Sequence, residues 1–188
     1  MKQKEKILLW GSNLWMFADA MLGPFFAVFT ERIGGDILDI SWALAVYYIA
    51  TGIFVIVVGK FSDGYSKEKL MVFGYGLTAV FTFGYLLVSQ PWHLFILQLG
   101  LGLALALANP TLYALYDKYS TPHHDGYIWG LADGQSKILM GLAIVFGGFI
   151  IGYFSFEILF VIMGFVQIAA TLYQTRLLLS RKRPRQKE

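Results

Sequence analysis

The sequence predicts an all-α membrane protein whose single domain, residues 1–188, holds six transmembrane helices. Hydrophobic residues make up 57% of the chain and charged residues only 14%, whereas about a quarter of a typical soluble domain is charged. The apolar residues are gathered into six runs, each close to the ~20 residues that a helix needs to cross a bilayer. No run carries the broad face of charged and polar residues that a helix in a soluble bundle turns to water. These observations favour a membrane protein over a soluble all-α bundle.

The first apolar run, Ile7–Phe29, contains Ala18-Asp19-Ala20, which resembles the cleavage site of a secretory signal. The apolar character continues beyond this site to Phe29, and polar residues interrupt the run at Ser12 and Asn13. We therefore interpret the run as the first transmembrane helix and not as a signal peptide.

The other five expected helices follow in order along the chain. They are Trp42–Phe61, Leu70–Val88, Trp92–Tyr116, Gly130–Tyr153 and Ile158–Leu179. Turn-forming residues separate the runs, for example Gly34-Gly35-Asp36 and Gln90-Pro91. Glycine and proline also recur within the runs, which membrane helices tolerate better than soluble ones. The loops are short, so we expect almost no mass outside the membrane.

The basic residues predict the orientation of the chain. If the N-terminus is cytoplasmic, all of the 15 Lys and Arg residues except Arg32 lie on the cytoplasmic side. Lys and Arg close to helix ends prefer that side. We therefore expect a multi-pass protein of the cell membrane with both termini in the cytoplasm, and a basic tail over residues 180–188 that anchors this topology. The net charge of +3 then reflects orientation in the lipid bilayer, and no nucleic-acid partner is expected.

The two halves of the chain look related. Pro24 with Glu31 and Pro110 with Asp117 share one spacing at the ends of the first and fourth runs, and residues 52–59 and 76–85 resemble residues 141–148 and 164–173. Because three helices is an odd number, the second copy must be inverted in the membrane. Inverted three-helix repeats are common in secondary transporters. We expect the repeats at about residues 7–88 and 92–179.

The segment between the second and third runs resembles the signature of the major facilitator superfamily, which is a Gly, three residues, an Asp and then a basic cluster. Gly59, Asp63, Lys67 and Lys69 match this pattern. Two positions depart from it, since Gly64 and Ser66 stand where Arg and Gly are usual.

The rest of the chain extends the resemblance and also limits it. The fourth run is rich in glycine, as in the family, but Gln98 stands where an Arg is common. The fifth run has Gly147-Gly148 and lacks the Gly-Pro pair that marks many antiporters, so antiport is not predicted. The resemblance covers the amino-terminal half of a twelve-helix member and implies a half of a major facilitator fold, that is, a half-sized transporter.

The resemblance leads to an expected homodimer. In the superfamily the two six-helix halves are parallel repeats about an axis along the membrane normal. Two copies of a six-helix chain can assemble in the same way, and two-fold homodimers are the commonest closed assembly. We expect such a dimer to share a cavity for a small-molecule substrate. The resemblance implies that the second and fifth helices form the interface, where four glycines would permit close approach: Gly52, Gly59, Gly141 and Gly148.

Asp19 is the first candidate for a substrate or proton site. It lies about 18 Å from Ile7 along a helix, which is near the middle of the bilayer. A carboxylate there costs several kcal/mol unless it is protonated, paired or facing water. A neutral, hydrogen-bonded structural Asp is the alternative. The resemblance implies that the first and fourth helices line the central cavity, into which Asp19 would then point.

The fourth expected helix carries a polar stripe within about 60° of one line. The stripe consists of Gln98, Gly102, Asn109, Tyr113 and Tyr116. In lipid it needs a protein or water partner, so it either binds substrate or holds helices together, and both interpretations stay open. Asn13 and Trp15 in the first helix are weaker candidates.

Two further groups of residues could form a site. Asp133 and Lys137 are four residues apart, and we expect a structural ion pair in preference to a substrate-sensing one. His123-His124-Asp125 resembles a metal cluster only superficially, because adjacent loop residues rarely converge on one ion. No metal site and no cofactor are therefore expected.

The resemblance also implies a cytoplasmic gate formed by Gly59, Asp63, Lys67 and Lys69. Asp63 would meet the positive end of the partner's fifth helix near residues 126–127 across the dimer. The alternative is that Asp63 only turns the loop.

No nucleophile–base pair, metal set or phosphate loop is visible, so we expect no enzyme. The leading hypothesis is secondary active transport of a small solute by a homodimer through alternating access, with Asp19 as the candidate proton-coupling residue. One alternative is a substrate-capturing membrane subunit that needs partner proteins, and another is a membrane scaffold that transports nothing.

Overall fold

The computed structural model describes residues 3–62, 64–119 and 125–179, which are helical apart from short connections and contain no strand, as predicted. The helices are α1 (Gln3–Ala20), α2 (Phe25–Arg32), α3 (Ile37–Ser62), α4 (Lys67–Gly84), α5 (Pro91–Tyr119), α6 (Asp125–Tyr153), α7 (Phe156–Gln174) and α8 (Arg176–Leu179), with a 3-10 turn, η1 (Tyr85–Leu87), after α4.

Five of the spans are long and apolar enough to cross a membrane, and the pair α1 and α2 makes a sixth if it is taken as one span. This pair is bent by 43°, so the unbroken first helix expected from the sequence is wrong in detail. The break follows from Pro24, which has no amide hydrogen to donate to Ala20 one turn earlier. Phe25 instead donates to the carbonyl oxygen of Leu22 at 2.7 Å, which closes a tight turn.

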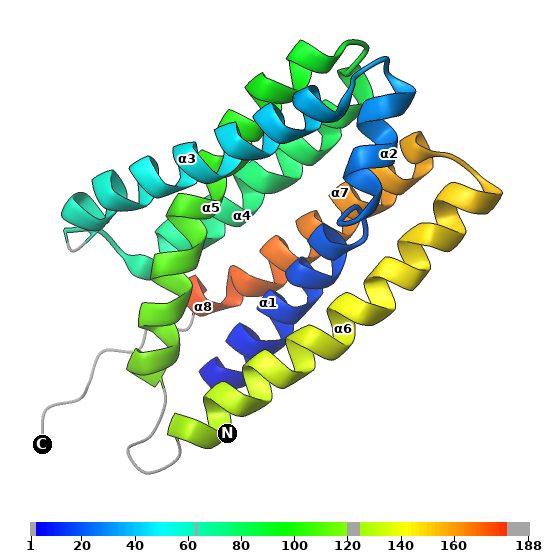
Figure 1. The fold of residues 1–188 in the computed structure, drawn as a ribbon. Helices are drawn as coiled ribbons and strands as arrows, with labels where there is room; N and C mark the ends of the chain where they lie inside the picture. The colour runs from blue at the N-terminus through cyan, green and yellow to red at the C-terminus, as the bar shows by residue number, and fades with distance from the viewer. Residues whose placement is uncertain (1–2, 63, 120–124, 180–188) are drawn as a thin grey trace, which may run out of the picture.

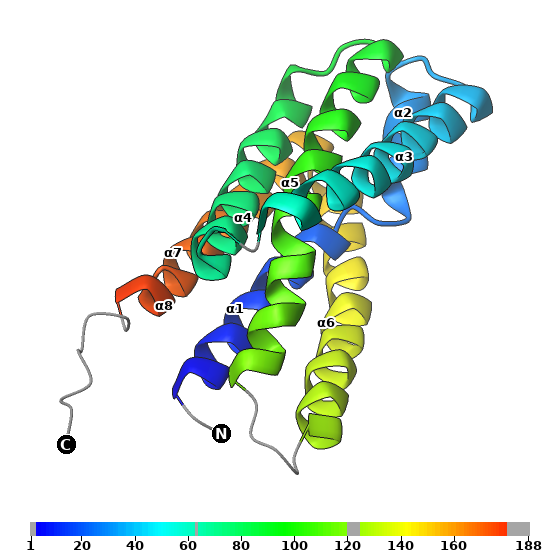
Figure 2. The same cartoon turned by 90° about the vertical axis from the view of Figure 1, so that its left-hand side faces the viewer.

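The spans form three layers. Figure 2 shows α4 and α7 on one side, α3 and α6 on the opposite side, and α1 and α5 between them. α5 packs along both α3 and α4, α1 packs along both α6 and α7, and α4 packs against α7. Exchanging α1, α3 and α4 for α5, α6 and α7 turns the two contacts of α5 into the two contacts of α1 and leaves the α4–α7 contact unchanged. This is the pattern that inverted repeats produce, although the division into two repeats stays a prediction.

The ends of the helices and the connections between them are divided between the two ends of the bundle. The beginnings of α1, α4 and α6 and the ends of α3, α5 and α8 lie at one end, which we call the terminal end (Figure 1). The α2–α3, α4–α5 and α6–α7 connections lie at the opposite end, as an even number of crossings requires. That the terminal end is cytoplasmic stays a prediction from the basic residues.

The break between α1 and α2 packs directly against α6. A side chain at Gly147 would collide with the backbone carbonyl of Met21, and one at Gly148 would lie 3.1 Å from the ring of Phe25. The glycine pair in α6 therefore lets its backbone approach the broken helix closely. Gly148 is thus packed inside its own chain, whereas Cβ atoms at Gly52, Gly59 and Gly141 would meet nothing within 4 Å.

Candidate functional site

A cavity of about 530 Å³ lies in the terminal half of the bundle, with side chains of α1, α5 and α6 as most of its lining. Tyr47 of α3 and Tyr75 of α4 complete the wall. The volume falls within the range of about 300–1,000 Å³ that is usual for small-molecule sites. We refer to it as the large cavity.

A second cavity of about 250 Å³ extends toward the opposite end. The α1–α2 break lines it, together with Phe26 of α2 and residues of α3 and α5, including Gln98. Trp15, Asp19, Tyr47 and Leu105 line both cavities. Asp19 therefore lies where the two cavities meet.

Asp19 occupies the last turn of α1, directly before the break. Its side chain is exposed, and it forms no hydrogen bond or ion pair with any residue in the described part of the chain. An ionised carboxylate at this depth needs water, a proton or a bound cation to remain stable. Interrupted helices at mid-membrane are a recurrent way to build such sites in transporters.

The other two charged groups of the large cavity are Asp133 and Lys137 of α6. Both are exposed, and within residues 3–62, 64–119 and 125–179 no ion pair joins them, so the structural pair expected from their spacing is not formed. The physical reason is that both side chains line the cavity, where water can solvate each charge separately.

Two contacts between α1 and α6 set the position of Asp133 and Lys137 along the bundle axis relative to Asp19. Nδ2 of Asn13 donates to Oε1 of Gln135 at 2.9 Å, and the Ser136 hydroxyl donates to the Met16 sulfur at 3.1 Å. Because α1 and α6 run in the same direction, this register sets Asp19 about one helical turn beyond Lys137. Acidic, basic and acidic groups therefore alternate along the cavity wall, at Asp133, Lys137 and Asp19.

Aromatic rings form much of the remaining wall. Trp15 and Tyr75 stack with ring centroids 4.6 Å apart, and the ring of Trp129 lies 5.3 Å from Tyr116 and 5.9 Å from Tyr113. The hydroxyl groups of Ser12 and Tyr116 are hydrogen-bonded to each other at 2.9 Å. Tyr47, Tyr75 and Trp129 were missed by sequence reasoning, because 17% of the chain is aromatic and no pattern distinguishes these rings from the others.

The structure separates the candidates proposed from sequence. Asn109 and Tyr113 line the large cavity with Asp19, whereas Gln98 lines only the second cavity. Asn13 lines neither cavity and instead joins α1 to α6 through Gln135. Gly102 packs against the α3 backbone, where a Cβ would lie 3.0 Å from the carbonyl oxygen of Tyr47.

The candidate gate is described only in part. Asp63 lies outside the described residues, as do His123 and His124. Lys67 begins α4, Lys69 is exposed in its first turn, and Gly59 is exposed near the end of α3. Among the described residues, no group of three or more His, Cys, Asp or Glu side chains could hold a metal ion.

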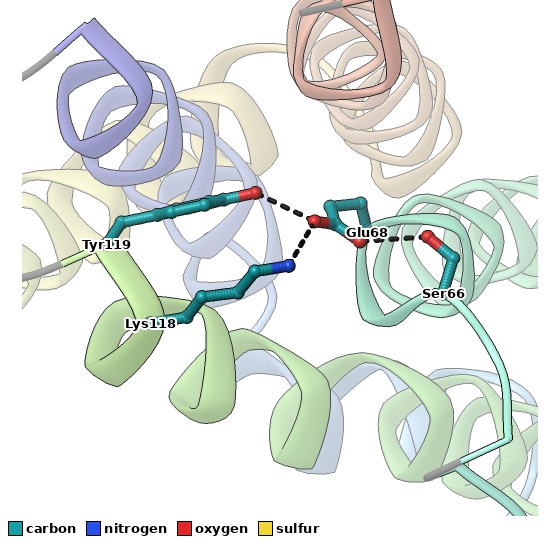
Figure 3. A network of polar contacts seen from close by, with 4 residues as sticks. All are labelled: Ser66, Glu68, Lys118 and Tyr119. Carbon is teal, nitrogen blue, oxygen red and sulfur yellow. Dashed lines mark hydrogen bonds and ion pairs between the residues drawn. The ribbon is translucent and has the colours of Figure 1, made fainter. Parts of the chain in front are cut away.

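The same loop leads into a polar cluster that sequence reasoning missed, centred on Glu68 (Figure 3). The hydroxyl of Ser66 donates to Oε2 of Glu68 at 2.8 Å. The Lys118 ammonium and the Tyr119 hydroxyl, both at the end of α5, donate to Oε1 at 2.8 Å each. Lys4 of α1 lies 5.2 Å from the centre of the Tyr119 ring. The cluster therefore joins α1, α4 and α5 at the terminal end.

The fold and the site together define a multi-pass α-helical membrane protein with a polar cavity between its helices. The model of the Major Facilitator Superfamily matches residues 8–188, so the chain belongs to this superfamily, and the resemblance in its loop signature is confirmed.

A curated relative supports a transporter. The chain is 22% identical over 171 residues to an uncharacterized MFS-type transporter of Methanocaldococcus jannaschii. The match covers 90% of this chain and 44% of the relative, so the chain spans less than half of that protein's length.

Proposed function

We propose that the chain is one protomer of a secondary active transporter, which moves a small solute by alternating access and couples the movement to protons. The position of Asp19 at the junction of two cavities carries the proposal, because the cavities extend toward opposite ends of the bundle. A group that is reached alternately from two sides of a membrane must lie at such a junction. Its unpaired carboxylate is suited to hold a proton in one step and a solute in another.

The exposed charges favour a second bundle over the large cavity. Asp19, Asp133 and Lys137 are exposed, whereas the flanking helices α3 and α6 carry exposed apolar side chains such as Ile53 and Leu142. Lipid cannot solvate three charged groups, so protein and water must cover them. We propose a second copy of the chain as the cover, related by a two-fold axis along the membrane normal. The open positions Gly52 and Gly141 suit a close approach between the copies.

Proton coupling is tested with purified protein in liposomes that contain a pH-sensitive dye. Small cations, zwitterions and sugars are added outside, one class at a time. We expect at least one class to drive proton movement with the wild-type protein, and Asp19→Asn to abolish it. Asp36→Asn is the matched control, because Asp36 lies outside both cavities and caps α3 through Leu38 N at 2.8 Å, a role that Asn also fills.

Solute binding without any proton or solute movement would contradict the proposal. That result would favour the alternative of a substrate-capturing subunit that needs partner proteins.

The dimer is tested by cross-linking, for which the absence of native cysteine is convenient. We expect Gly141→Cys to form a covalent dimer in native membranes with a short bifunctional reagent. Phe73→Cys is the control, because Phe73 is 62% exposed on α4 in the opposite layer. Equal cross-linking of the two variants, or a monomer by native mass spectrometry from nanodiscs, would overturn the homodimer.

A further inference from the structure

We propose that the large cavity binds an organic cation with an apolar or aromatic body. This names the substrate class of the proposed transporter, and it rests on that proposal only for the transport step. Binding to the cavity is measurable by itself.

The charges of the cavity favour a cation. Asp19 and Asp133 contribute two carboxylates and Lys137 one ammonium, so the wall carries a net negative charge. None of the three has a hydrogen-bonding or ion-pair partner within the described residues, so each side chain is available to contact a ligand. An anionic ligand would face two carboxylates and is disfavoured.

The aromatic wall favours an organic cation over a metal ion. Six rings, two Trp and four Tyr, line the cavity. Aromatic faces attract cations and also pack against apolar groups, which is how proteins recognise quaternary ammonium ligands. A bare metal ion would need several converging oxygen or nitrogen ligands, and the cavity offers none beyond separate carboxylates.

Three of the six hydroxyl groups that line the cavity are already bonded within the protein, which disfavours a sugar. A sugar needs many free donors and acceptors, but the cavity hydroxyls of Ser12 and Tyr116 are bonded to each other, and that of Ser136 is bonded to Met16. Among the described residues, Asn109 contributes the only side-chain amide to the lining, and the hydroxyls of Tyr47, Tyr75 and Tyr113 form no hydrogen bond there. These neutral groups can hold a polar substituent of the cation beside the charged ones.

Lys137 has a specific role in this site. It lies one turn from Asp133 on its own helix and about one turn from the level of Asp19 on α1. Its ammonium is thus the cavity's own cation and competes with a ligand for both carboxylates. Removing this charge should strengthen cation binding, whereas removing either carboxylate should weaken it.

Binding to the purified full chain in mild detergent tests the inference with two probes of the same shape and opposite charge, tetraphenylphosphonium and tetraphenylborate. Equilibrium dialysis with the radiolabelled probe gives the dissociation constants. We expect tetraphenylphosphonium to bind at least about tenfold more tightly than tetraphenylborate, which corresponds to about 1.4 kcal/mol.

The inference also predicts whether each substitution weakens or strengthens binding of tetraphenylphosphonium. Asp19→Asn should weaken tetraphenylphosphonium binding about tenfold, and Asp133→Asn should weaken it as well, because each removes one carboxylate from the cavity wall. Lys137→Gln should strengthen it severalfold. Glu157→Gln is the control, since Glu157 pairs with Arg32 far from the cavity and should leave binding unchanged.

Equal binding of the two probes, or equal effects of Asp19→Asn and Glu157→Gln, would overturn the inference. Weaker binding of tetraphenylphosphonium in Lys137→Gln would overturn it as well. Charge-selective binding without proton or solute movement in liposomes would contradict the transporter and leave the cation site intact.

Discussion

Two carboxylates in the bundle have opposite surroundings. Glu68 lies buried in the first turn of α4, at the positive end of that helix, and accepts three hydrogen bonds from side chains. Asp19 lies in the last turn of α1, at the negative end of that helix, and has no partner within the described residues. The first arrangement stabilises the folded chain. The second leaves a charge uncompensated, which natural proteins tolerate mainly at functional sites.

The largest expected effect is a difference in the free energy of unfolding between variants of Glu68 and of Asp19. Glu68→Ala should lower the free energy of unfolding by about 2 kcal/mol, mainly because it leaves the buried Tyr119 hydroxyl without this acceptor. Asp19→Asn should leave stability unchanged or raise it by up to about 1 kcal/mol, since it removes a charge from the negative end of a helix. Denaturant titration in mixed micelles measures both. Equal losses in the two variants would remove the distinction between a structural and a functional carboxylate.

A smaller effect is expected for the single contact between Glu68 and Lys118. A double-mutant cycle of Glu68→Gln and Lys118→Met should give a coupling energy of about 1 kcal/mol. The value is modest because the Lys118 side chain is 51% exposed, although that of Glu68 is only 6% exposed. A coupling near zero would assign the stability to Ser66 and Tyr119 instead, and the single variant Tyr119→Phe then measures that share.

The smallest change in the free energy of unfolding is expected for a third carboxylate, that of Glu157. Glu157 lies 3.5 Å from Arg32 in an ion pair whose side chains are 58% and 53% exposed. Exposed pairs of this kind contribute little, so Glu157→Gln should change the free energy of unfolding by less than about 0.5 kcal/mol. The same titration measures it, with Asp36→Asn as reference. A loss as large as that of Glu68→Ala would mean that burial does not explain the difference.

Local patterns in the sequence accounted for the spans but not for their contacts. Apolar length alone predicts six crossings. Asp19 was a candidate because of its depth in the membrane, and Asn109 and Tyr113 because they lie on a polar stripe; all three line the large cavity. The break at Pro24 had a sequence signal, a proline inside the first run, that was outweighed by the length of that run.

Contacts between distant segments could not be read from sequence. Glu68 meets Lys118 across 50 positions, and no periodicity links them. The spacing of Asp133 and Lys137 suggested a pair, but the spacing says only that both lie on one face of a helix and not that this face lines a cavity.

The tryptophans of the chain have a practical consequence for spectroscopy. Two of the five, Trp15 and Trp129, line the large cavity, whereas Trp10, Trp42 and Trp92 are more than half exposed on the outside of the bundle. Replacing the three outer residues with Phe would leave fluorescence that originates in the large cavity alone. Brominated lipids would quench the outer group and spare the inner one. Binding of a ligand in the large cavity could then be followed by the fluorescence of Trp15 and Trp129, without an attached dye.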